Sequence, residues 1–190
     1  TGGMNIASDS GYGDTWKGQG IGVDEYDVEN ISTAALTWRS QFGLTLMGSM
    51  VYNKMNVRGS FFQDRWGVYL VGNKYEREDY VITNKVLSAE YTVSDYVFTA
   101  EYMLTEHDYL SRAERTIAGT TTFSDWSSNN REQESYYIST SYTALDWLEL
   151  GVYYSVLYYD KKDKSGDLFA GVNYPRHQAW HKNWALASKI

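Results

Sequence analysis

The sequence predicts an all-β protein, an antiparallel transmembrane β-barrel or a large portion of one, with short periplasmic turns and long outer loops. Several stretches alternate apolar and polar residues with a period of two, which is the pattern of strands with one apolar face. The chain has 18 tyrosines and 7 tryptophans against one proline, and aromatic residues favour strands. The connections between the alternating stretches are either very short or long, as in membrane barrels.

The clearest alternation lies in a predicted hairpin from Lys85 to Thr105. A tight turn at residues 94–96 separates its two arms, and each arm has one apolar and one largely polar face. The polar face includes Glu90 and Glu101, at comparable distances from the turn. The apolar face consists of Leu87, Ala89, Tyr91, Val93, Phe98, Ala100, Tyr102 and Leu104.

A second predicted hairpin runs from Ser135 to Tyr159 and turns at residues 144–146. Its second arm carries an unbroken alternate row of apolar residues. That row is about as long as the 9–11 residues that a tilted strand needs to cross a bilayer. It contains Leu148, Leu150, Val152, Tyr154, Val156 and Tyr158.

Three further strands complete the predicted set. Ile31–Arg39 and Gly43–Asn53 form a hairpin around a turn at residues 40–42, and Trp180–Ile190 forms a final strand. Aromatic residues lie near the ends of many strands, as in the girdles at the two membrane interfaces. These residues are Trp38, Tyr52, Tyr91, Trp147, Tyr158, Tyr159 and Trp184.

Long polar connections are expected at residues 54–84, 107–134 and 160–178. Within the first of them, Trp66–Gly72 and Asp79–Thr83 are expected to pair as a small hairpin of an outer loop. The alternative is that both are barrel strands joined by a charged turn at Lys74–Glu78. The first assignment gives seven barrel strands and the second gives nine.

Residues 1–30 are rich in Gly and Asp, and we expect them to be a loop or arm. Residues 31–190 are expected to form a single barrel domain. Bacterial barrels have an even number of strands, so the predicted odd number indicates that this domain is incomplete. A self-contained barrel would need one more strand within residues 1–30.

Composition excludes several functions. The net charge is −7 and the pI about 4.9, which disfavours nucleic acid as a partner because phosphate binding needs basic clusters. The only local group of lysines, at 161–164, alternates with aspartates and suggests a solvated loop. Without cysteine there is no disulfide and no thiolate. No segment approaches the ~18 apolar residues of a membrane-spanning helix, and the first residues carry no export signal.

Charged residues on the polar faces of the predicted strands are candidates for lining a pore. Carboxylates in a confined channel raise the local concentration of cations. The other interpretation is that these carboxylates pair with the basic members of the set and fill a small lumen. The pore-lining candidates are Arg39, Glu90, Glu101, Glu149 and Lys189.

Arg112 and Arg115 are candidates for a constriction, because a loop folded into a barrel can narrow its channel. They lie in the long 107–134 segment, where Tyr109–Ile117 is expected to form a short helix. The alternative is a solvated outer loop.

No catalytic residue, metal site or cofactor is predicted, and we expect no enzymatic activity. His177 and His181 have a spacing that suits a metal pair only on a helix, which Pro175 disfavours. Asp160–Asp167 resembles a calcium loop, but lysines occupy the third and fifth ligand positions. The serines and threonines at 116–128 lack the surroundings of a nucleophile.

Several strand motifs occur together in this chain: Asp27-Val28-Glu29-Asn30 before Leu36-Thr37-Trp38-Arg39, then Ala89-Glu90-Tyr91 with Ala100-Glu101-Tyr102, and the runs 146–155 and 182–186. With these motifs, residues 24–190 resemble the middle-to-late part of bacterial porin-like outer-membrane proteins. The resemblance implies a channel in the outer membrane of a Gram-negative bacterium for passive diffusion of small hydrophilic solutes or ions. It also implies a lipid bilayer as surroundings and a homotrimer as assembly. The chain is about half as long as such a barrel requires.

Two alternatives stay open. One is a closed small barrel with a structural or adhesive role, whose lumen is packed with side chains. The other is a soluble all-β carbohydrate-binding module, in which the apolar rows form a core. Partition into a membrane separates the second alternative from both barrels, and conductance separates the first from a channel.

Overall fold

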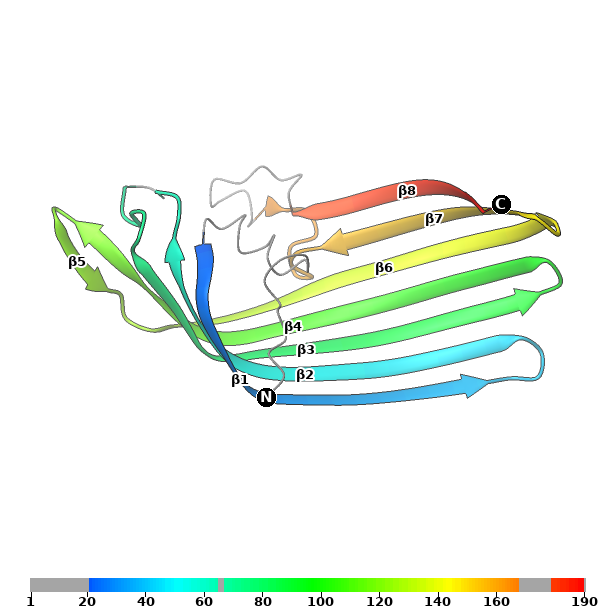
Figure 1. The fold of residues 1–190 in the computed structure, drawn as a ribbon, viewed down its shortest axis with the longest axis horizontal. Helices are drawn as coiled ribbons and strands as arrows, with labels where there is room; N and C mark the ends of the chain where they lie inside the picture. The colour runs from blue at the N-terminus through cyan, green and yellow to red at the C-terminus, as the bar shows by residue number, and fades with distance from the viewer. Residues whose placement is uncertain (1–20, 65–66, 168–178, 190) are drawn as a thin grey trace. The chain divides into compact units, whose positions relative to one another are not determined.

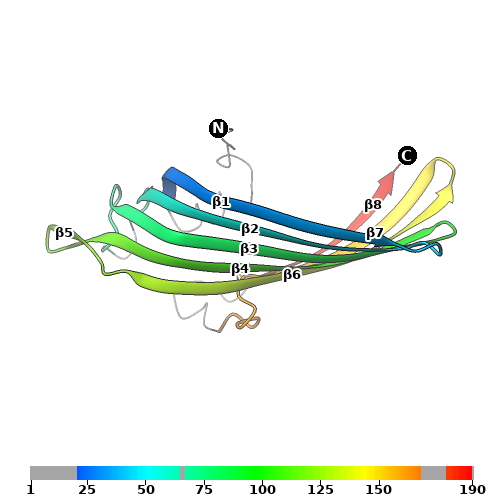
Figure 2. The same ribbon diagram turned by 90° about the horizontal axis from the view of Figure 1, so that it is seen from below.

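A computed structural model describes residues 21–64, 67–167 and 179–189. The described residues contain eight strands, of which seven form a sheet in the order β1-β2-β3-β4-β6-β7-β8, while the short β5 pairs with β4 (Figures 1 and 2). The strands are β1 (Ile21–Arg39), β2 (Leu44–Phe61), β3 (Lys74–Val93), β4 (Tyr96–Ile117), β5 (Thr120–Phe123), β6 (Ser127–Leu145), β7 (Leu148–Tyr158) and β8 (Trp180–Lys189).

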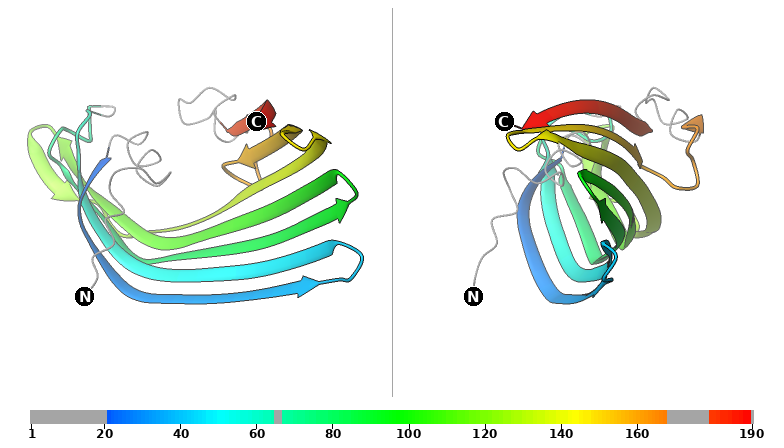
Figure 3. Two further views of the ribbon diagram at one scale, coloured as in Figure 1. Left: turned by 45° about the vertical axis from the view of Figure 1, so that its right-hand side comes forward. Right: turned by 90° about the vertical axis from the view of Figure 1, so that its right-hand side faces the viewer.

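The prediction of an all-β antiparallel fold is confirmed. Each of the seven predicted strands overlaps one of the seven strands in the sheet order. The three predicted short turns join β1 to β2, β3 to β4 and β6 to β7. Figure 1 shows these three turns at the same end of the strands, and Figure 3 shows β6, β7 and β8 side by side.

The connections expected at 54–84 and 107–134 are mostly strand. The ends of β2 and β4 and the beginnings of β3 and β6 extend into them. The expected hairpin of Trp66–Gly72 with Asp79–Thr83 is wrong, because Asp79–Thr83 belongs to β3. Residues 65–66 lie outside the described residues.

A buried cation explains why the alternation was hidden in these segments. Arg77 of β3 is buried, and its guanidinium lies 5.1, 5.2 and 4.3 Å from the ring centroids of Tyr75, Tyr80 and Tyr109. Aromatic faces attract a cation, so arginine occupies a position that hydropathy assigns to solvent. A pattern of apolar and polar residues cannot show this kind of strand.

The first strand corrects a second expectation. β1 begins at Ile21, so residues 21–30 are strand rather than loop or arm, whereas residues 1–20 lie outside the described residues. This part of β1 is joined to β2 by ion pairs, from Arg58 to Glu25 at 3.1 Å and from Lys54 to Glu29 at 2.8 Å. Charged cross-strand pairs leave no apolar row in the sequence, which is why the strand was missed.

The described residues belong to two compact units, which we call unit 1 and unit 2. Unit 1 has a small buried core that includes Met55, Val57 and Phe61 at alternate positions of β2. The ring of Phe61 stacks on that of Tyr69 with 5.0 Å between their centroids. Unit 1 comprises residues 21–31, 53–81 and 108–130, and unit 2 comprises residues 32–52, 82–107 and 131–189, as far as they are described.

Gly43 fixes the first short turn of unit 2. Its φ of 89° lies in the left-handed region, and a Cβ atom there would lie 2.2 Å from the carbonyl oxygen of Thr92 on β3. The Thr92 N–H donates a hydrogen bond to the Gly43 carbonyl at 3.0 Å, so the turn of one hairpin is joined to the next hairpin. Glycine meets both requirements, because it has no side chain and tolerates positive φ.

We expect Gly43→Ala to lower the free energy of unfolding by about 1–3 kcal/mol more than Gly72→Ala does, measured by urea titration. Gly72 is a matched control, because it has the same φ of 89° but nothing within 4 Å of the added Cβ. Equal losses in the two variants would show that the turn moves away from Thr92 without cost.

Candidate functional site: the two faces of unit 2

The register of β6, β7 and β8 sorts the side chains of unit 2 onto two faces. Residues directly opposite one another on neighbouring strands point to the same face. On one face, which we call the apolar face, Ile138 lies opposite Tyr154, and Tyr154 lies opposite Trp184. On the other, which we call the polar face, Ser139 lies opposite Tyr153.

The apolar face is exposed. Leu36, Trp184 and Leu186 have 76%, 73% and 88% of their surface accessible. Monomeric proteins in water rarely expose contiguous apolar patches of more than a few hundred Å². The face therefore suits contact with lipid or with another apolar surface. Its exposed members include Leu36, Trp38, Leu46, Met50, Leu87, Tyr91, Phe98, Ile138, Tyr142, Leu150, Trp184 and Leu186.

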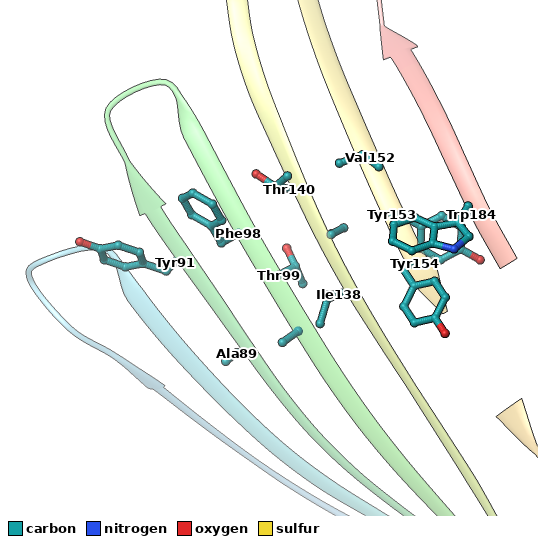
Figure 4. Close-up of a pocket in the computed structure, with 12 residues that line it drawn as sticks. Ala89, Tyr91, Phe98, Thr99, Ile138, Thr140, Val152, Tyr153, Tyr154 and Trp184 are labelled. Atoms are coloured by element: carbon teal, nitrogen blue, oxygen red, sulfur yellow. The ribbon is translucent and has the colours of Figure 1, made fainter. Parts of the chain in front are cut away.

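A shallow hollow of about 440 Å³ lies on the apolar face, lined by residues from β3 to β8 (Figure 4). Figure 4 shows the rings of Tyr91, Phe98 and Trp184 on three different strands around it. Ala89 and Ala100 also line the hollow, and their small side chains leave the space open. The hollow is apolar and contains no constellation of reacting groups.

Glu90, Glu101 and Tyr137 come together on the polar face. Both carboxylates are close enough to the Tyr137 hydroxyl to interact with it electrostatically. Neither carboxylate is in an ion pair with another described residue. Pairing with a basic residue, which the sequence left open for these two groups, is therefore absent from the described part of the chain.

The other pore-lining candidates lie near the short turns. Glu149 of β7 is the direct cross-strand partner of Lys189 on β8, and it alternates with Leu150 of the apolar face. Both residues therefore belong to the polar face. Arg39 is the last residue of β1, and no ion pair joins it to another described residue.

The two constriction candidates are in unit 1, on a strand. Tyr109–Ile117, expected to form a short helix in a loop, is the end of β4 and pairs with β5. Arg112 and Arg115 therefore lie on a strand, which corrects the expected helix, while their role at a constriction stays a prediction. The guanidinium of Arg115 lies 5.5 Å from the ring centroid of Tyr69.

Arg112 is held by an ion pair and by two aromatic rings. Its guanidinium lies 2.6 Å from the carboxylate of Glu76 on β3. The ring centroids of Phe123 and Trp126 lie 4.5 and 4.4 Å from the guanidinium carbon. These contacts give Arg112 a structural role between the strands of unit 1.

The sequence analysis missed a polar cluster at the end of the apolar face. Glu134 lies opposite Tyr158 in the β6–β7 register and is buried. The Tyr102 hydroxyl donates a hydrogen bond to its carboxylate at 3.0 Å, and the Lys164 ammonium pairs with the same group. Burial raises the pKa of Glu134, but the bonds from Lys164 and Tyr102 outweigh burial, so the pKa lies below its ordinary value.

The lysines at 161–164 were expected to belong to a solvated loop, and all three of them form ion pairs with glutamates of β6 instead. Lys161 and Lys162 lie 3.3 and 3.4 Å from the Glu132 carboxylate, which lowers the pKa of Glu132, chiefly through the bond from Lys161. The Lys161 N–H also donates to the Glu132 carbonyl at 2.7 Å. In the sequence, the lysines appeared to be neutralised by the aspartates that alternate with them. In the structure, two of these aspartates accept hydrogen bonds from the loop's own backbone: the Lys162 N–H donates to Asp160 and the Asp167 N–H to Asp163, each at 2.8 Å.

A second ion pair marks the same boundary of the apolar face on the neighbouring hairpin. The Lys85 ammonium lies 2.7 and 2.8 Å from the two carboxylate oxygens of Glu106. Lys85 precedes Leu87 and Ala89 at the same alternation on β3, and Glu106 follows Tyr102 and Leu104 at the same alternation on β4. We call this boundary, with the pairs Lys85–Glu106 and Lys164–Glu134, the rim of the apolar face.

The described residues contain no group of three or more His, Cys, Asp or Glu that could hold a metal ion. His181 lies on β8 with its ring 5.6 Å from that of Tyr159, and His177 lies outside the described residues. No helix in the described part of the chain is long and apolar enough to cross a membrane.

No protein-family model and no curated protein matches the chain. Among solved structures, the crystal structure of Neisserial surface protein A (NspA) is similar, with 15% sequence identity over 88% of this chain and 96% of that chain and a TM-score of 0.25. At this TM-score the likeness carries no argument. The antiparallel sheet and its exposed apolar face are what support a membrane barrel.

The lowered pKa values of Glu132 and Glu134 predict how the 160–167 loop responds to pH. A carboxyl group with a lowered folded-state pKa stabilises the fold above its unfolded value of 4.5, and this contribution is lost as the pH falls through the folded-state pKa. We expect hydrogen-exchange protection of the Lys161 amide, corrected for intrinsic rates, to decrease as the pH falls below about 4.5.

Lys164→Gln should lower the protection of the Lys161 amide already at pH 7 and should weaken its dependence on pH. Equal protection in wild type and variant at pH 7 would contradict the role of the Lys164–Glu134 pair in docking the loop.

Proposed function

We propose that unit 2 crosses the bacterial outer membrane as a β-barrel, or a portion of one, and lets small hydrophilic solutes or ions diffuse through it passively. One observation carries this proposal. The sheet of unit 2 exposes an apolar face and, on its other side, a polar face with carboxylates that have no ion pair among the described residues. A soluble protein would bury the first face, whereas a membrane channel needs both.

The dimensions of the apolar face suit a bilayer. On β7 the alternate apolar row runs from Leu148 after the short turn to Tyr158 at the rim, the whole of this 11-residue strand. At about 3.3 Å per residue and with a tilt of about 40°, a strand of this length spans roughly 25 Å, the height of the apolar band of outer-membrane barrels. The rim then lies at the interface on the side of the long connections, where paired charges and aromatic hydroxyls contact water.

The free edges of the sheet require partners in the bilayer. β1 and β8 are the two ends of the strand order in the described residues. Unpaired backbone N–H and C=O groups are not tolerated in lipid. In the membrane, these strands therefore pair with each other or with further strands, and either arrangement closes a lumen lined by the polar face.

The polar face gives the proposed lumen an acidic region around Glu90 and Glu101. Two unpaired carboxylates in a confined aqueous space favour cations over anions. No step of chemistry is required, and selectivity follows from charge and width alone.

Insertion can be tested with the chain by itself. We expect far-UV circular dichroism to show strand structure when the urea-unfolded chain is diluted into detergent micelles, and much less when it is diluted into buffer. A chain that is folded and monomeric in plain buffer would contradict membrane insertion and would favour the soluble carbohydrate-binding alternative.

Transport is tested by conductance across a planar bilayer in a salt gradient. We expect channels with a preference for cations, and we expect Glu90→Gln with Glu101→Gln to lower the cation-to-anion permeability ratio by roughly two- to threefold. The reversal potential measures this ratio.

Glu106→Gln is the matched control for the conductance measurement. It removes the same charge from β4, but Glu106 belongs to the rim of the apolar face and is paired with Lys85. We expect the control to leave the reversal potential unchanged. Insertion without any conductance would contradict transport and favour the closed structural or adhesive barrel.

A further inference from the structure

One lysine at the boundary of the apolar face differs from the others. Lys182 of β8 lies opposite Val156 of β7, which in turn lies opposite Tyr136 of β6. The side chain of Lys182 therefore belongs to the apolar face, in the row nearest the rim. Its ammonium lies 4.8 Å from the ring centroid of Trp180.

Lys182 has no carboxylate partner among the described residues, whereas the two lysines of the rim have one each. Lys85 is paired with Glu106, and Lys164 is paired with Glu134. A cation next to an apolar surface is costly to leave without a counter-charge when water is replaced by lipid. Among the described residues of this boundary, Lys182 is thus a lysine whose charge has no carboxylate to compensate it.

The hollow of the apolar face begins beside Lys182. Trp184 lines the hollow and follows Lys182 by two residues on β8, so the two side chains are about 7 Å apart along the same face. The hollow extends from Trp184 across to Tyr91 of β3, and Figure 4 shows Thr99 and Ile138 between these two rings. An acyl chain fits such a surface, because small residues leave room and aromatic rings give broad apolar contact.

We propose that this part of unit 2 binds a phospholipid with a net negative charge, with an acyl chain in the hollow and the phosphate on Lys182. The occupant follows from the charge complementarity of an unpaired cation and from the apolar hollow directly next to it, which a free phosphate ion would leave empty. Lys182 lies on the side of the long connections, so the lipid belongs to the outer leaflet. The inference rests on membrane insertion, which is part of the proposed function, and not on conductance.

The test is native mass spectrometry of the chain folded in detergent, with phosphatidylglycerol or phosphatidylcholine of identical acyl chains. We expect phosphatidylglycerol to be retained more than phosphatidylcholine. Lys182→Gln should lower the retention of phosphatidylglycerol about fivefold, the effect of one lysine near a lipid phosphate. Lys85→Gln is the matched control: it removes a lysine from the same boundary, but one that already has a carboxylate, and we expect it to change retention little.

Two further experiments test the hollow and the phosphate contact separately. Ala100→Phe fills the hollow and should lower the retention of both lipids, and its fold is checked by circular dichroism. Glycerol phosphate, which carries the charge without acyl chains, should not displace the lipid at equal concentration.

Equal losses with Lys182→Gln and Lys85→Gln, or displacement by glycerol phosphate, would overturn the lipid site. Failure of the chain to fold in detergent would overturn membrane insertion together with it, whereas folding without conductance would overturn only transport.

Discussion

The antiparallel register of the strands is the constraint on which both faces of unit 2 depend. Side chains alternate along a strand, so a slip of one residue between β6 and β7 would move Val152 and Tyr154 to the polar face and Glu149 to the apolar one. The short turns fix this register at one end of each hairpin. The bond between Gly43 and Thr92 extends the control from one hairpin to its neighbour.

The two units differ in how many large apolar side chains they expose, although unit 2 also buries apolar residues such as Ile82 and Val156. Unit 1 places Met55, Val57 and Phe61 inside, as a protein does in water, where apolar burial is the main driving force. Unit 2 leaves Leu36 and Leu186 exposed. An exposed apolar row of this kind suits an apolar medium, and this is the basis of the proposed insertion of unit 2 into a membrane.

The charged residues also differ between unit 1, the rim of the apolar face and the polar face of unit 2. Exposed cross-strand ion pairs join the strands of unit 1, where solvent screens them, so they serve mainly to set the pairing. At the rim of unit 2, Lys85 and Lys164 neutralise Glu106 and Glu134 next to apolar surface, where an unpaired charge costs more. On the polar face, Glu90 and Glu101 have no such partner among the described residues, which suits the aqueous lumen proposed above.

The sequence by itself determined the strands of unit 2, their turns and the apolar and polar residues of each, because alternation is a local property written directly in the order of residues. It did not reveal the strands of unit 1, where Arg77 and Arg112 occupy places among aromatic rings that hydropathy assigns to water. It also did not pair Glu134 with Lys164, thirty residues away by number, or separate Lys182 from the paired lysines. Those partnerships depend on which strands and loops become neighbours, and only the tertiary structure decides that.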